Sequence, residues 1–171
     1  MAKQPRDRKE PVTPKATRPH MPGYGLPRGT RGLLPWTWAE TRLTRSHNYW
    51  IVTTRPDGTP HAMIVWGVWV GGRFYFSTRR ESRKARNLAA NPSCTVCTEK
   101  AAEAAIVEGR AVEISDPAGI ARVAPAYNRK YKPWTLDPKM GGIYEVQPRV
   151  VFGMWEKNFK AATRWSFEPA S

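Results

Sequence analysis

The stretch YWIVTTRPDGTPHAMIVWGVWVGGRFYFS, residues 49–77, decides the fold that this sequence predicts. It contains three runs of β-branched and aromatic residues that are typical of strands, at 49–54, 59–70 and 73–77. Pro56-Asp57-Gly58 separates the first two runs, and Gly71-Gly72 separates the last two. Turns this short join antiparallel neighbours. The stretch therefore predicts a three-stranded antiparallel meander.

The middle run of this meander is apolar on both faces. Alternate residues of a strand point to opposite sides. One face carries His61, Met63, Val65 and Trp69, and the other carries Ala62, Ile64, Trp66, Val68 and Val70. Such a strand needs cover on both sides of the sheet. The interior of a barrel can take one face, and a helix, a ligand or a second subunit can take the other.

Further strands and three helices are expected around the meander. Thr37 and Glu40 have the spacing of a capping box, which predicts a helix over 37–46. A short helix is expected to end at Asn91-Pro92, and a longer one to span 117–131. Further strand-like runs lie at 93–99, 104–108, 111–115, 142–147, 149–155 and 162–167. This order predicts an α+β fold dominated by an antiparallel sheet.

The 171-residue chain is strongly basic, with 28 Lys and Arg against 14 Asp and Glu and a formal net charge of +14. Residues 1–31 hold eight of the basic residues and six of the 16 prolines. We expect them to form a flexible basic arm, either without a task or touching a partner subunit or an anion, before a folded domain over 32–171. The folded part is basic too, which suggests an anionic partner: nucleic acid, membrane headgroups or a phosphorylated ligand.

Several classes of protein are disfavoured by the sequence. The chain has no bilayer-spanning apolar segment and no signal-peptide pattern at its start, so we expect a cytoplasmic protein without membrane association. Cys94 and Cys97 form a C-x-x-C spacing within a strand-like run. Residues three apart on a strand face opposite ways, so we expect two separate thiols and no metal site.

The short helix follows a dense run of positive charge. Arg79, Arg80, Arg83, Lys84 and Arg86 lie within eight residues, and only one acidic residue opposes them. A helix N-terminus offers unpaired backbone N–H groups and a positive dipole end, which together bind anions. With Ser82 or Thr78 as the cap, the neighbouring side chains Arg79, Arg83 and Lys84 become candidate phosphate ligands. The alternative interpretation is a solvated basic helix face.

An ordered series of segments resembles a known family. The segments are TRPDGTPH (54–61), VWGVW (65–69), FST (76–78), SRKARNL (82–88), VEG (107–109), YNRKY (127–131) and ATRW (162–165). Over about 34–168 the chain resembles the flavin and deazaflavin oxidoreductases of the pyridoxamine-5′-phosphate-oxidase-like superfamily. The resemblance implies a six-stranded antiparallel split β-barrel with a few flanking helices. It also implies a homodimer that holds its cofactor in a groove between the subunits.

The resemblance also implies which residues bind the cofactor. Ser82, Lys84 and Asn87 match the Ser-x-Lys-x-x-Asn pattern that grips the cofactor phosphate, beside the candidate ligands Arg79 and Arg83. The cofactor ring would be lined by His61, Met63 and Val65, or by the alternate residues of the same strand, with Ser77 and Thr78 at its edge. Three C-terminal residues would approach the ring across the dimer: Thr163, Arg164 and Trp165. No residue is nominated as catalytic.

Two cofactors are compatible with this resemblance. FMN ends at one phosphate, whereas the deazaflavin coenzyme F-420 continues into a lactyl and polyglutamate tail with several carboxylates. The cationic run offers more charge than one phosphate requires, which favours F-420 over FMN. The expected function is an oxidoreductase that transfers a hydride between the reduced cofactor and a small organic substrate.

Two other functions stay open at this point. One is a protein that binds a flavin, a deazaflavin or a tetrapyrrole without turnover. The other is a basic nucleic-acid-binding protein whose aromatic residues stack on bases. The Trp residues occur mainly in apolar strands, where core or dimer packing explains them, so nucleic acid is the less favoured partner.

Overall fold

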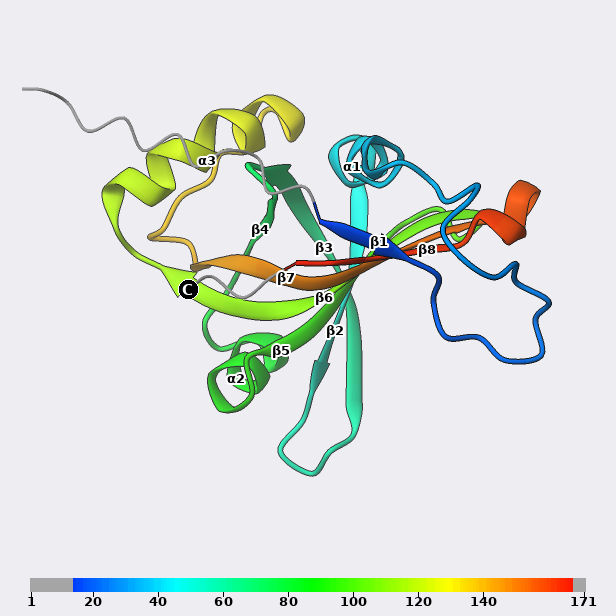
Figure 1. Ribbon diagram of the computed structural model, residues 1–171. Helices are drawn as coiled ribbons and strands as arrows, with labels where there is room; N and C mark the ends of the chain where they lie inside the picture. The colour runs from blue at the N-terminus through cyan, green and yellow to red at the C-terminus, as the bar shows by residue number, and fades with distance from the viewer. Residues whose placement is uncertain (1–13, 168–171) are drawn as a thin grey trace, which may run out of the picture.

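The computed structural model describes residues 14–167, and six antiparallel strands close into a barrel at its centre. The barrel strands are β2 (Asn48–Thr54), β3 (Pro60–Val70), β4 (Arg73–Thr78), β5 (Ser93–Thr98), β6 (Glu103–Ile114) and β7 (Gly142–Trp155). Their order is β7-β4-β3-β2-β5-β6, and pairing of β6 with β7 closes the ring (Figure 1). The predicted six-stranded antiparallel split barrel and the α+β class are confirmed.

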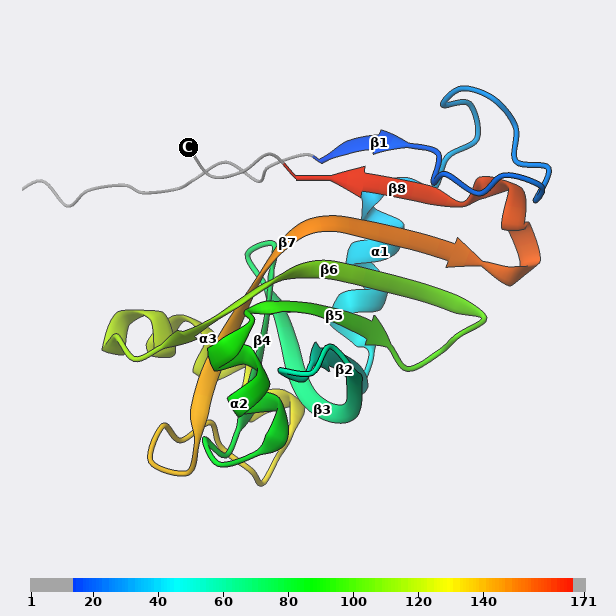
Figure 2. The ribbon, with the colours of Figure 1, turned by 90° about the horizontal axis from the view of Figure 1, so that it is seen from below.

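Two short strands extend the sheet beyond the barrel. β8 (Thr163–Ser166) pairs with the C-terminal part of β7, and β1 (Lys15–Thr17) pairs with β8 (Figure 2). β4 pairs with the N-terminal part of β7, so that β4 and β8 follow one another along β7.

The segment before the first helix differs from the predicted flexible arm where it can be described. β1 is a strand of the sheet, and the Arg18 guanidinium donates hydrogen bonds to the backbone carbonyls of Lys160 and Arg31. Further bonds reach the carbonyls of Gly29 and Ala162. The Pro-rich composition hides this arrangement because the strand partner lies about 150 residues later. Residues 1–13 of the predicted arm lie outside the described residues.

Three α-helices and a 3₁₀-helix flank the barrel. They are α1 (Trp36–Arg45), α2 (Arg83–Ala90), α3 (Pro117–Lys130) and η1 (Glu156–Ala161). Ser82 and Asp116 cap α2 and α3, because their side chains accept hydrogen bonds from Ala85 N and Gly119 N. The capping box predicted at Thr37 is wrong. Pro35 occupies the N-cap of α1, and this places Thr37 inside the helix.

In two places, a pair of strands predicted as separate forms one long strand in the structure. The runs 104–108 and 111–115 belong to β6, whose register shifts between Glu108 and Gly109. The runs 142–147 and 149–155 belong to β7, where Pro148 lies opposite Gly109. A Cβ atom at Gly109 would stand 2.3 Å from the Gln147 carbonyl oxygen. The bulge and the glycine therefore let the strand pair continue past a proline.

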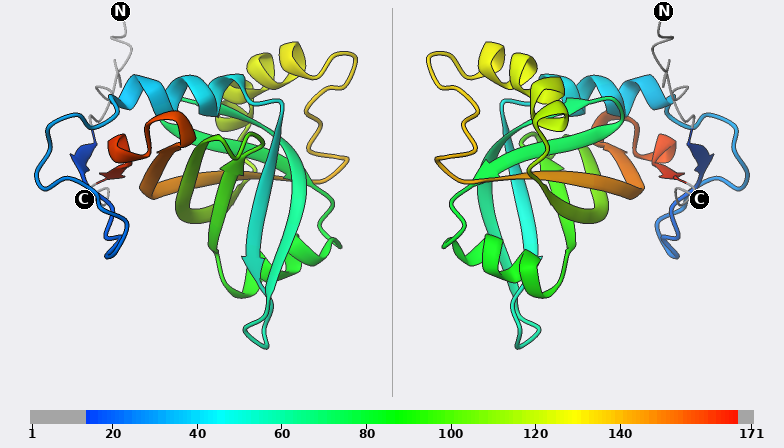
Figure 3. Two further views of the ribbon diagram at one scale, coloured as in Figure 1. Left: turned by 90° about the vertical axis from the view of Figure 1, so that its right-hand side faces the viewer. Right: turned by 90° about the vertical axis from the view of Figure 1, so that its left-hand side faces the viewer.

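The two ends of the barrel carry different elements. α1 and α3 lie at one end, whereas α2 and the tip of the β2–β3 hairpin lie at the other (Figures 1 and 3). Inside the barrel the packed side chains include Tyr49, Ile51, Phe74, Phe76, Val96, Val107, Val146 and Val151. A second cluster under α3 joins that helix to β3, β4 and β7 through Val68, Tyr75, Val123, Tyr127 and Ile143. These two clusters stabilise the barrel, and α2 packs at one end of it.

Candidate functional site

The start of α2 lies directly after a barrel strand. β4 ends at Thr78, and Ser82 N donates to the Arg79 carbonyl in the turn that leads into the helix. The Ser82 hydroxyl caps the helix and lies 3.1 Å from the Thr78 hydroxyl. The first backbone N–H groups of α2 are thereby held at one end of the barrel, in the geometry that favours an anion.

Positive charge surrounds this helix start. Within the described residues, Arg79, Arg83, Lys84 and Arg86 form no ion pair, whereas Arg80 Nε lies 2.9 Å from Glu113 Oε1. Partial burial lowers the pKa of Lys84, because desolvation disfavours its charged form. A partly buried cation without an acidic partner is costly on its own, and a bound anion would compensate it.

The tip of the β2–β3 hairpin faces the same helix. An Arg55 Nη2 lies 3.4 Å from His61 Nδ1 across the hairpin. Desolvation lowers the pKa of His61, and the positive charges of Arg55, Lys84 and Arg83 lower it further. His61 therefore lies within the field of the α2 cations. Arg55 is a site residue that the sequence analysis did not single out. Its position directly before the Pro-Asp-Gly turn could have identified it, because such a turn brings Arg55 opposite Thr59, whose carbonyl accepts from Arg55 N.

Asn87 holds α2 against this hairpin. Its side chain is fully buried, and Nδ2 donates to Thr53 Oγ1 at 3.0 Å. The Thr53 hydroxyl in turn donates to the His61 carbonyl at 3.4 Å. The Asn87 Oδ1 atom is buried and has no hydrogen-bond partner within the described residues. The structure thus places the Asn87 side chain between the helix and the strands, buried and bonded to Thr53.

The residues expected to line a cofactor ring lie at different depths. His61, Met63 and Val65 share one face of β3, opposite Thr53, Ile51 and Tyr49 of β2. Met63 is 45% exposed, whereas Val65 is buried in the barrel core. Ser77 and Thr78 end β4 and are half-buried. Met63 is therefore the most accessible member of this set; His61, Ser77 and Thr78 are half-buried, and Val65 is buried.

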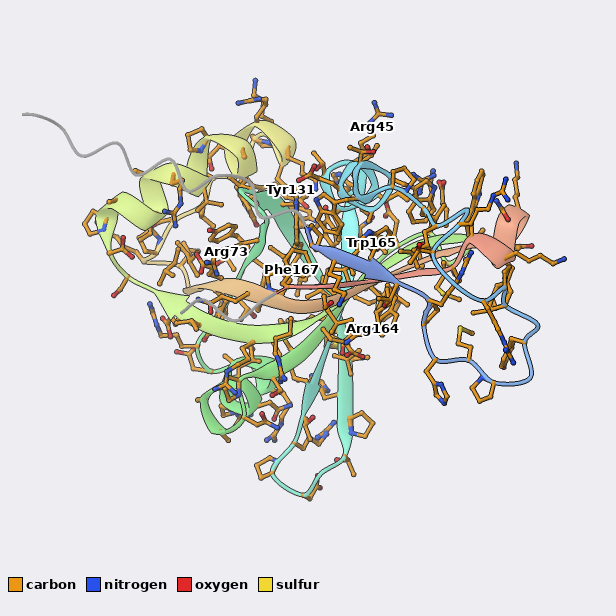
Figure 4. All side chains as sticks on the ribbon, in the orientation of Figure 1. Arg45, Arg73, Tyr131, Arg164, Trp165 and Phe167 are labelled. Atoms are coloured by element: carbon orange, nitrogen blue, oxygen red, sulfur yellow. The ribbon has the colours of Figure 1, made fainter. Side chains whose placement is uncertain are left out.

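The three C-terminal residues lie away from α2 within one chain. Thr163 pairs with Gly153 near one end of β7, whereas Thr78 pairs with Gly142 at the other end. The Thr163 hydroxyl accepts from Leu34 N and donates to the Ala161 carbonyl. Arg164 and Trp165 lie on β8 (Figure 4), and Trp165 is buried in the core. The structure does not bring these three residues together with Lys84 in one chain.

An uncovered apolar strip lies on the outer face of the β2–β3 hairpin. Trp50 and Ile64 are register partners, and Trp66 follows two residues later on the same face. Their exposed fractions are 45%, 52% and 37%. Trp66 also stacks on Tyr131, with ring centroids 4.8 Å apart. We call Trp50, Ile64 and Trp66 the outer apolar strip.

Other kinds of site were sought in the part of the chain that the structure describes. Cys94 and Cys97 are both free thiols, as the strand spacing predicts. No cluster of three or more His, Cys, Asp or Glu residues that could hold a metal ion occurs in residues 14–167. The helices described in that range are all too short or too polar to cross a bilayer.

A family model described as pyridoxamine 5′-phosphate oxidase matches residues 39–155, which include the whole barrel core and α2. This chain belongs to that family. The match confirms the resemblance that the ordered segments suggest. A search of curated proteins finds no match.

Solved structures share the fold of this family member. A conserved hypothetical protein from Mycobacterium tuberculosis is 20% identical, with a TM-score of 0.60, and the match covers 81% of this chain and 92% of that one. A FAD-binding protein from Mesorhizobium loti is 15% identical, with a TM-score of 0.57 and coverages of 78% and 96%. An F-420 reductase is 26% identical, with a TM-score of 0.52 and coverages of 64% and 91%.

Proposed function

We propose that this family member is an oxidoreductase that uses coenzyme F-420, with FMN as the alternative cofactor, and acts on a small organic substrate. The observation that carries the proposal is the joining of the capped start of α2 to the β2–β3 hairpin. Asn87 of α2 donates to Thr53, which donates to the His61 carbonyl, and Arg55 lies 3.4 Å from the His61 ring. Arg55, Arg83 and Lys84 form no ion pair among the described residues. Family membership and the similarity to a FAD-binding protein and an F-420 reductase support a flavin-type cofactor.

The residues present fit the phosphate of such a cofactor. The backbone N–H groups of α2 and the Lys84 ammonium provide donors of the kind that hold phosphate in other proteins. Asn87 and Thr53 fix the distance between this helix and the hairpin. Met63 offers exposed apolar surface beside His61 for a planar ring. When bound, the cofactor supplies the hydride-transfer chemistry, while these residues bind and orient it.

The distribution of cations favours F-420 over FMN in this proposal. Lys84 and Arg83 suffice for one phosphate. Arg79 and Arg86 add positive charge that no acidic side chain of the described residues pairs with. A cofactor with several carboxylates beyond its phosphate would use this additional charge.

The outer apolar strip supports a homodimer as part of the proposal. Trp50, Ile64 and Trp66 are large apolar side chains on adjacent strands. Although Trp66 stacks on Tyr131, all three keep more than a third of their surface exposed in the described chain. A contiguous apolar patch of this kind is typical of an interface. A second copy is the occupant that the family resemblance implies, and it would place a second molecule beside the hairpin that carries His61 and Met63.

The test is direct binding followed by turnover. The purified protein is titrated with F-420 and with FMN, and binding is followed by cofactor fluorescence. We expect tighter binding of F-420 and consumption of the reduced cofactor when suitable small acceptors are added. Absence of binding to both cofactors would contradict the proposal. Binding without consumption by any acceptor would favour a non-catalytic carrier, and salt-sensitive binding to random DNA alone would favour the nucleic-acid alternative.

A further inference from the structure

Arg55 and His61 form an unusual contact because both side chains carry N–H donors. The Arg55 Nη2 lies 3.4 Å from His61 Nδ1. A guanidinium can only donate, so Nδ1 must accept, and the ring proton of the neutral imidazole must then be on Nε2. Within the described residues no other hydrogen bond involves the His61 side chain. This contact thus favours the neutral tautomer in which Nε2 carries the single N–H group.

The charges that face His61 are nearly all positive. Arg55 comes from the hairpin, and Lys84 and Arg83 come from α2; all three lower the pKa of His61, after the larger effect of desolvation. The nearby acidic residue of the hairpin is Asp57, whose Oδ1 accepts bonds from Thr59 N at 3.0 Å and from Thr59 Oγ1 at 2.6 Å. Asp57 is thus engaged within its own turn. Its charge interacts with Arg55, which helps to lower the pKa of Asp57, but Asp57 is not among the groups that shift the pKa of His61.

We propose that Arg55 and His61 form a second anion subsite beside Lys84, and that His61 takes up a proton when a phosphate or carboxylate binds there. The inference rests on the proposed cofactor site and adds a proton-coupled contact to it. Without an anion, the surrounding cations disfavour a protonated imidazole. A bound anion reverses the local field, so the imidazolium becomes favourable. Protonation of Nδ1 ends its hydrogen bond with Arg55, and both the guanidinium and the imidazolium ring can then donate to the anion.

The direction of the pH dependence follows from this coupling. A bound anion raises the pKa of His61, so the complex binds more protons than the unliganded protein in the interval between the two pKa values. The contribution of His61 to affinity is therefore complete below the pKa of unliganded His61 and is lost as the pH rises through the higher pKa of the complex. Phosphate itself ionises with a pKa of about 6 and acts in the opposite direction, so a matched variant is needed to isolate His61.

The first experiment follows the ring protons of His61 by NMR in the full chain, assigned with His61→Gln. Its pKa is measured with no anion and with saturating inorganic phosphate, FMN or F-420. We expect a value below the ordinary value of about 6.5 without anion and a higher value with each ligand. Riboflavin, which lacks the phosphate, is expected to leave the pKa unchanged. A larger shift with F-420 than with FMN would assign the subsite to the tail carboxylates; equal shifts would assign it to the phosphate.

The second experiment measures proton uptake by calorimetry of FMN or F-420 binding in buffers of different ionisation enthalpy. We expect uptake in the wild type, its loss in His61→Gln, and its retention in His20→Gln, a control on the exposed segment before α1. The affinity ratio of wild type to His61→Gln should rise about tenfold at low pH for each unit by which the pKa of His61 rises. Arg55→Gln should raise the pKa of unliganded His61 and weaken binding.

The outcomes separate this inference from the function on which it rests. If the cofactors bind but the pKa of His61 does not move, the cofactor site stands and the subsite is overturned. If neither cofactor binds but inorganic phosphate raises the pKa, the proposed function fails and the anion subsite is supported. If no anion moves the pKa, the inference is overturned whatever the cofactors do.

Discussion

The ammonium group of Lys130, the last residue of α3, donates a hydrogen bond to the hydroxyl of Tyr49 in the barrel wall at 2.8 Å. The same Nζ donates to the Gly67 carbonyl at 2.9 Å and lies 4.7 Å from the centre of the Tyr49 ring. The hydroxyl of Tyr131 accepts from Gly67 N at 2.8 Å. The end of α3 is therefore tied to β2 and β3 by polar groups placed in a largely apolar setting.

This arrangement predicts that the contribution of Lys130 to the free energy of unfolding increases as the pH rises into the alkaline range. Burial lowers the pKa of Lys130 to about 8, with Glu99 opposing the shift. Between pH 8 and pH 10 the unfolded chain then binds more protons at this position than the folded chain, so the stability contributed by Lys130 increases with pH. We expect the difference in unfolding free energy between wild type and Lys130→Met to change by on the order of 1–2 kcal/mol in favour of the wild type across this interval.

Urea denaturation at several pH values measures this effect, with Lys132→Met as the control because Lys132 is exposed. The control should track the wild type at every pH. Above pH 10 the raised pKa values of Tyr49 and Tyr131 work in the opposite direction, so the comparison is made below that point. A constant difference between wild type and Lys130→Met from pH 8 to pH 10 would show that the ammonium is not desolvated.

The outer apolar strip predicts that assembly depends on Trp50. We expect the wild type to be a dimer by light scattering at micromolar concentration, and Trp50→Lys to shift it to monomer while leaving the fold intact. The reason is that Trp50 and its register partner Ile64 are about half exposed in one chain, and a lysine there would bury a charge in the interface. The measurement also tests the shared cofactor groove, because a monomeric variant should lose affinity for the cofactor.

Tyr24→Lys is the matched control for this experiment. Tyr24 is 66% exposed in the segment before α1, where its ring centroid lies 5.9 Å from that of Phe159, and it is not part of the strip. It should leave the molecular mass in solution unchanged. A wild-type protein that is monomeric throughout the micromolar range would contradict the dimer.

Much of the fold follows from local sequence signals. The Pro56-Asp57-Gly58 and Gly71-Gly72 turns predict β2, β3 and β4 to within a residue or two, because the conformation of a short turn depends on its own residues. The barrel itself depends on pairing between β6 and β7, whose residues lie about 30–50 positions apart, and no local pattern specifies that register. β1 was missed for the same reason: among the described residues it pairs with β8, near the other end of the chain.

The candidate site was predicted in part, and helix geometry explains the difference. Lys84 does lie in the first turn of α2, next to the cap that Ser82 provides. Asn87 matches the family pattern, yet its side chain packs inward beside Ala85 and Leu88, a direction that depends on how α2 sits on β2. Arg55 stands in no strand or helix, and only the folded hairpin brings it to His61.

The cations of α2 predict a difference between the two cofactors. Arg86 is exposed and has no ion pair among the described residues, whereas Arg80 pairs with Glu113. We expect Arg86→Gln to weaken F-420 binding several-fold more than FMN binding, since only F-420 extends carboxylates beyond its phosphate. Arg80→Gln should have a smaller effect because Glu113 already neutralises that charge. Fluorescence titrations at low and high salt check the prediction, and the difference should shrink as salt screens the charges. Equal losses of affinity for both cofactors would indicate that the carboxylate tail of F-420 does not lie near Arg86.

The most direct prediction concerns Lys84. Its ammonium is partly buried in the first turn of α2, where backbone donors and the helix dipole favour an anion. Lys84→Ala should remove one charge-assisted contact, worth about 1.5–3 kcal/mol, and weaken the binding of either cofactor roughly ten- to a hundred-fold. Because burial of an unpaired ammonium is unfavourable, the unliganded variant should be as stable as the wild type or more so.

Lys132→Ala is the control: it removes an equal charge from the exposed loop after α3 and should leave cofactor affinity within about twofold of the wild type. If a folded Lys84→Ala protein binds the cofactor as tightly as the wild type, the phosphate does not bind at the start of α2. The cations of α2 would then form a solvated basic helix face.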